Sequence, residues 1–116
     1  MSAQRWERLR LALEEDDVEA AVVAKAYTED RHGRVDHGVS RSITLRPASG
    51  WLIEVEDRWW SKNPDTWLGW VVTLSGPDSL TRGQTRPLKR RAEVVAAVRL
   101  YTEAVPSPSV GTGAAS

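Results

Sequence analysis

The N-terminal part of the chain carries an apolar stripe with helical spacing. Trp6, Leu9 and Leu13 recur three and four residues apart, as on one face of an α-helix. Four acidic residues at 14–17 follow directly, and acidic groups at the C-terminal end of a helix oppose its dipole. The pattern therefore predicts a helix that breaks or kinks near Asp16.

The following segment, residues 17–30, fits two structures. On a helix, four apolar residues share one face, namely Ala20, Val23, Ala24 and Tyr27. We predict a second helical segment on this basis, with a strand at 20–28 as the main alternative. The polar stretch RHGRVDHG at 31–38 contains two glycines and predicts a loop.

Between residues 39 and 75 the apolar period changes to two, which is typical of half-buried strands. The alternation predicts strands at 39–46, 51–60 and 67–75. Short segments rich in proline, glycine, serine and aspartate connect them, so we expect an antiparallel β-meander.

The register of this meander follows from keeping one apolar face together, because a slip of one residue exchanges the two faces of a strand. Ile43 then lies beside Val55, and Val55 lies beside Val72. The same register predicts an ion pair between Arg41 and Asp57.

This register also divides the tryptophans, five of which fall between residues 51 and 70. Trp51, Trp59 and Trp70 are predicted to point into the core. Trp60 and Trp67 are predicted to face each other on the opposite, exposed side.

The last apolar stripe predicts a C-terminal helix at about 87–104. Its apolar positions are Leu88, Ala92, Val95 and Val98, and a proline at 87 suits a first helical turn. The fold class is therefore α+β: N-terminal helical segments, a three-stranded antiparallel β-meander, and a C-terminal helix packed on one sheet face. We expect one globular domain at 1–104 and a disordered Pro/Ser/Gly tail at 105–116.

Composition excludes several protein classes. The 116 residues include no cysteine, so disulfides and thiol chemistry are excluded. No apolar run approaches the roughly eighteen residues of a membrane span, and charges at the N-terminus replace a signal peptide's apolar core. We therefore expect a cytoplasmic protein. Thirteen arginines against three lysines indicate GC-rich coding, which suits a phage- or plasmid-borne accessory factor.

The net charge is zero but unevenly distributed. Residues 1–30 hold eight acidic and four basic side chains, and residues 81–103 hold six basic and two acidic ones. Such asymmetry can steer an anionic partner to one end of the molecule. The alternative is that the two ends attract each other within the fold.

The signals for catalysis are weak, so we do not expect an enzyme. His32 and His37 lie in a polar stretch without further ligands at metal-site spacing, and we predict neither a metal site nor a cofactor. Glu54 and Glu56 lie two apart on one strand face, which is ordinary for an exposed sheet surface. No motif indicates a small-molecule substrate.

The sequence favours a binding role, with another protein or a second copy of the chain as partner. Tryptophan and arginine are enriched in interface hot spots, so the candidate contact residues are Trp60, Trp67 and Arg58. The alternative is single-stranded nucleic acid bound by tryptophan and arginine. The basic candidates for that role are Arg82, Arg86, Lys89, Arg90 and Arg91.

Overall fold

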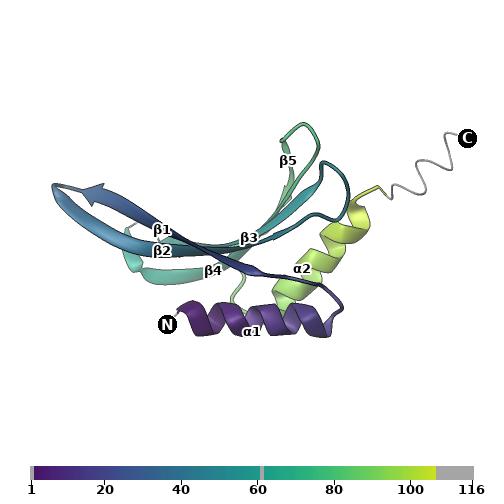
Figure 1. Ribbon diagram of the computed structural model, residues 1–116, viewed down its shortest axis with the longest axis horizontal. Coiled ribbons are helices and arrows are strands. Elements are labelled where there is room, and N and C mark those ends of the chain that lie inside the picture. Colours follow the sequence, from purple (N-terminus) through teal and green to yellow (C-terminus); the bar gives the residue numbers. More distant parts are fainter. Residues whose placement is uncertain (1, 61, 107–116) are drawn as a thin grey trace, which may run out of the picture.

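The fold is a five-stranded antiparallel sheet with both terminal helices packed on one face (Figure 1). The computed structural model describes residues 2–60 and 62–106. In chain order the elements are α1 (Ser2–Glu15), β1 (Val22–Arg31), β2 (Arg34–Leu45), β3 (Leu52–Trp60), β4 (Asn63–Ser75), β5 (Thr81–Gln84) and α2 (Arg91–Ala104). The strands lie side by side in that same order. The predicted α+β class with a helix at each end is confirmed, whereas the predicted number of three strands was too small.

The predicted helix break near Asp16 is confirmed, because α1 ends at Glu15. Asp17 adopts a positive φ of 61°, and the amide of Val18 donates to the carbonyl of Leu13 at 2.9 Å. This left-handed residue stops the helix and turns the chain toward the sheet.

The predicted helix at 17–30 and loop at 31–38 are wrong, since these residues form a long β-hairpin. β1 pairs with β2 from Val22 opposite Ile43 to the turn, and the strand alternative was correct. Only His32 and Gly33 form the turn, with φ of 53° and 79°. Two successive positive φ values match the type I′ turn whose twist suits a tight hairpin. Local apolar spacing could not separate helix from strand here, and pairing with β2 decided the outcome.

The predicted registers of the meander are confirmed over its central part. Ile43 lies opposite Val55, and Val55 lies opposite Val72. The ladder between β3 and β4 then shifts next to Arg58, so that Trp59 rather than Trp60 lies opposite Trp67. A β-bulge of this kind adds residues to one strand and re-aims the side chains beyond it.

The chain after β5 runs beside β4 before the last helix begins. Trp70 and Leu88 exchange both backbone hydrogen bonds at 2.7 Å, forming an isolated bridge. The predicted helix start at 87 is therefore wrong: α2 starts at Arg91 and ends, as predicted, at Ala104. Gly69 permits this contact, because a Cβ there would lie 2.6 Å from the carbonyl oxygen of Leu88.

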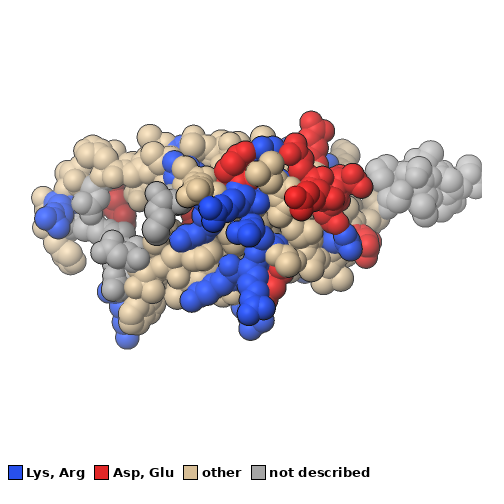
Figure 2. All heavy atoms as spheres, turned by 90° about the horizontal axis from the view of Figure 1, so that it is seen from below, with Lys and Arg blue, Asp and Glu red and all other residues tan. Residues whose placement is uncertain are grey.

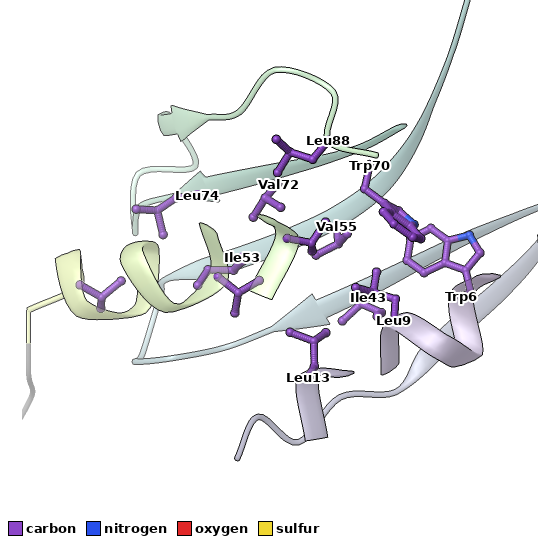
Figure 3. Packing of buried hydrophobic residues seen from close by; sticks show 13 residues of the cluster. Trp6, Leu9, Leu13, Ile43, Ile53, Val55, Trp70, Val72, Leu74 and Leu88 are labelled. Atoms are coloured by element: carbon purple, nitrogen blue, oxygen red, sulfur yellow. The ribbon is translucent and has the colours of Figure 1, made fainter. Parts of the chain in front are cut away.

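The core lies between the sheet and the two helices (Figure 3). Leu9 and Leu13 of α1 and Val94 and Val98 of α2 are fully buried, as is Ile53 of β3. Most core positions were predicted. Leu45 and Val95, however, are only half-buried and pack against the hydrophobic core from its margin.

The core also includes Val105, directly after α2. The predicted disordered tail falls mainly on residues 107–116, which lie outside the described residues. Within the described ranges, neither helix has the length and apolarity needed to cross a membrane.

Candidate functional site

Three tryptophans meet around one carboxylate at the end of the core that adjoins the N-terminus of α1. The Asp57 carboxylate accepts one hydrogen bond from Trp6 Nε1 and one from Trp67 Nε1, each 2.9 Å long. Trp70 packs edge-to-face on both rings, with ring centroids 6.2 Å from Trp6 and 5.0 Å from Trp67. We call these four residues the tryptophan cluster. It ties α1 to β3 and β4, so its role is to hold the fold together.

Trp67 is therefore not half of an exposed pair. Its ring is half-buried against the core, and the guanidinium carbon of Arg5 lies 3.7 Å from its centroid. This distance is typical of a cation–π contact. The predicted ion pair of Asp57 with Arg41 stays a prediction, and the contacts above show that the carboxylate is an acceptor for indole N–H groups.

The tryptophans exposed at the β3–β4 hairpin are Trp59 and Trp60, with 37% and 45% of their surface accessible. The predicted exposure of Trp60 is confirmed, but Trp60 does not lie opposite Trp67. The predicted inward position of Trp59 is wrong, because the core does not extend that far along the strand. Trp51 is half-buried against the hydrophobic core and Trp70 is buried, as expected. Arg58 is exposed opposite Gly69.

Both hairpins extend past the N-terminal end of α1 (Figure 1). β2 and β3 pair only from Ser42 to Leu45 and from Ile53 to Glu56, so the hairpins form two separate arms beyond that point. Alternation along β1, β2 and β3 places five exposed apolar side chains on the helix-bearing side of the arms, together with the exposed polar side chains of Thr28, Asp30 and His37. The apolar ones are Ala24, Ala26, Val35, Val39 and Trp59. We call this surface the arm underside.

The arm underside continues the apolar face of the sheet beyond the helices. Val35 and Val39 are 55% and 48% exposed, although their strand buries Ile43 completely. Of the nine large apolar side chains that are exposed in the described part of the chain, six lie on the two hairpins. Three of the six, Val35, Val39 and Trp59, face the underside, where exposed apolar side chains can mark an interaction site.

The predicted nucleic-acid residues do not form an uninterrupted basic surface. Figure 2 shows Lys and Arg side chains gathered over the middle of the helix-bearing side, with Asp and Glu side chains beside them to the right. A hollow between α1 and the start of α2 brings Lys89, Arg90 and Arg91 together, but Glu15 and Asp16 line it too.

The other two basic candidates have acidic neighbours as well. Arg82 pairs with Asp78 at 2.6 Å, and Arg86 lies 3.7 Å from Glu93. Elsewhere, an exposed ion pair joins Arg99 of α2 to the acidic residue Asp16 that follows α1. The opposite charges of the two chain ends thus meet within the fold, which weakens the attraction for phosphate.

The pKa of one carboxyl on the face opposite the helices, that of Glu54, is shifted by its surroundings. Burial raises the pKa of Glu54, and the nearby charge of Glu56 raises it further, while Arg46 opposes both effects. His32 is exposed in its turn, and His37 is exposed on β2 with Nδ1 3.3 Å from the Thr28 hydroxyl. Among the described residues, no three His, Asp or Glu side chains are grouped as metal ligands.

Sequence reasoning missed the role of Asp57 as an acceptor for indole N–H groups and the place of Val35 on a sheet face. Asp57 stood out as a polar residue on an apolar strand face, which is a usable signal for a buried acceptor. Val35 lay in the stretch predicted as a loop, so its place on a sheet face was hidden, whereas Val39 was placed at the start of the predicted strand 39–46. Comparison with known protein families, with curated proteins and with solved structures finds no match to this chain.

Proposed function

We propose that this protein is a non-catalytic recognition domain that binds an apolar segment of a partner protein against the arm underside. The observation that supports the proposal is the exposure of Val35, Val39 and Trp59 on the same sheet face that forms the core. Covering such side chains removes apolar surface from water, which is the main favourable term in protein association. Tryptophan is also enriched among the hot-spot residues of protein interfaces.

The Arg58 and Trp60 side chains lie on the other side of β3 by strand alternation. They therefore remain candidates for contacts at the rim, and Trp59 takes the place that Trp67 had in the sequence prediction. Half-burial and the hydrogen bond to Asp57 restrict Trp67 to a supporting role. The acidic neighbours of the basic residues make nucleic acid the weaker alternative.

Site-specific photo-cross-linking in the native host tests the proposal. A benzophenone side chain at position 39 or 59 is expected to capture the same partner protein. The matched control is position 40, because Ser40 is exposed but points to the opposite face. Equal capture from position 40, or different proteins from positions 39 and 59, would contradict a single docking surface on the underside.

The substitution Val35→Asp supplies the second test. Val35 is 55% exposed, so the charge is tolerated in the free protein but is costly in an apolar contact. We expect capture from position 39 to fall about tenfold or more while thermal stability is unchanged. Leu100→Asp, at a 64% exposed position on α2, is the matched control and should leave capture intact.

A further inference from the structure

The outer edge of β1 is long and open. Within residues 2–60 and 62–106, β1 is the first strand of the sheet and pairs only with β2, and residues 23–30 are all exposed. An edge strand of this length presents unpaired backbone donors and acceptors that can pair with another chain. The other edge, β5, is a strand of four residues.

The hairpin turn determines which backbone groups point outward. In an antiparallel ladder, hydrogen-bonded and non-hydrogen-bonded pairs alternate, and a two-residue turn is closed by a hydrogen-bonded pair. Arg31 and Arg34 are that closing pair, so every second residue counted back from Arg31 bonds to β2. The residues between them direct their N–H and C=O groups to the open edge: Ala24, Ala26, Thr28 and Asp30.

We infer that the β1 edges of two copies pair antiparallel about a twofold axis at Tyr27, joining the two sheets into one. A twofold axis perpendicular to the sheet leaves a given side chain on the same sheet face in both copies. Two residues can therefore lie opposite each other only if both numbers are odd or both are even. With Tyr27 on the axis, Lys25 of each copy lies directly opposite Glu29 of the other copy, so this contact is made twice. All outward backbone groups from Ala24 to Asp30 then find partners.

Charge selects this register among the allowed ones. Shifting one β1 strand by two residues against the other, in either direction, breaks both Lys25–Glu29 contacts. A shift by four residues places Lys25 opposite Lys25 of the second copy, or Glu29 opposite Glu29. Opposite charges across a ladder stabilise the pairing, and like charges destabilise it. The pairs about the axis are of the non-hydrogen-bonded type, in which facing side chains are closest.

The conformation of Tyr27 leaves room at the axis. Its ring lies over Gly38 of β2, where an added Cβ would be 2.5 Å from the phenol oxygen. The ring thus leans away from the open edge and covers backbone that glycine leaves bare. The inference does not depend on the proposed function, because it uses the strand edge and not the arm underside.

Charge exchange tests the register. Sedimentation equilibrium of the full chain, from micromolar to millimolar concentration, is expected to show a dimer. Lys25→Glu and Glu29→Lys should each weaken it about tenfold, because each replaces two attractive contacts by repulsive ones. The double variant should restore the dimer. Lys89→Glu, which changes the net charge equally at an exposed position on the helix side, should have no effect.

The absence of cysteine from the chain allows an independent test. A Tyr27→Cys variant should form an intermolecular disulfide on mild oxidation, because facing Cβ atoms at the axis lie near disulfide distance. Val23→Cys, four residues from the axis, should remain reduced. A monomer at all concentrations, a dimer insensitive to both charge changes, or a double variant that stays dissociated would overturn the inference.

Discussion

Replacing Asp57 should test whether one carboxylate organises the tryptophan cluster. Asp57→Ala removes the acceptor of two indole N–H groups and leaves the Trp6 and Trp67 donors without it. Trp6 is fully buried, so water cannot replace the lost acceptor there without opening the packing. The variant therefore loses two hydrogen bonds to a charged group and gains an unsatisfied donor.

The expected cost follows from these contacts. Hydrogen bonds to charged groups contribute about 1.5–3 kcal/mol each. Asp57 is only half-buried, so the lower end of the range applies, and the two bonds together give about 3 kcal/mol. The free energy of unfolding of a typical domain is roughly 5–15 kcal/mol, so this loss is a large fraction of the total. A loss of this size lowers the melting temperature by about 10–20 °C.

Urea denaturation followed by far-UV circular dichroism measures the loss. Asp57→Asn should fall between Asp57→Ala and the wild type, because the amide keeps one acceptor oxygen but presents N–H groups to the second indole. Glu56→Ala, at the adjacent exposed position, should change the free energy of unfolding by no more than about 0.5 kcal/mol. A cost below about 1 kcal/mol for Asp57→Ala would refute the reasoning, because it would mean that the indoles do not need this acceptor.

Two further predictions concern backbone and pH. Gly69→Ala should lower the free energy of unfolding by more than about 2 kcal/mol, because φ at this position is +133° and the new Cβ meets the backbone of Leu88. Gly33→Ala, with φ of +79° and open space around the Cβ, should lower it by about 1 kcal/mol in the same urea assay. Since the pKa of Glu54 is raised in the folded protein, stability falls as pH rises from 4.5 through that raised pKa. Glu54→Gln should thus raise the melting temperature at pH 7 and not below pH 4.5. Equal gains at both pH values would contradict the cause given for the pKa shift.

The sequence by itself determined the elements whose signal is local or strictly periodic. The stripe of Trp6, Leu9 and Leu13 defined α1, and the acidic run after it marked the helix end. Alternation gave the registers that set Val55 between Ile43 and Val72, because a one-residue slip would turn apolar side chains to water. These features depend on residues close in sequence or on a pattern repeated along neighbouring strands.

Only the tertiary structure decided the conformation of residues 22–31. Their apolar spacing suits a helix and a strand equally, and a strand gains its hydrogen bonds from a partner distant in sequence. The tight turn at His32 and Gly33 brings that partner close, since both residues adopt positive φ. Most of the arm underside was hidden in the sequence for the same reason, because Val35 and the β1 residues acquire a face only when the hairpin forms.

The tertiary structure also decided which tryptophans lie inside. Alternation alone placed Trp59 in the core and Trp67 outside. Trp59 keeps the helix-bearing face but lies beyond the end of the core, whereas the shift of the ladder beside Arg58 brings Trp67 against the core. Gly69 and the bridge to Leu88 lie next to this shift, and Asp57 fixes Trp67 in its half-buried position. A bulge breaks the period of two from which sequence reasoning works, so side chains beyond it are determined by contacts between distant segments.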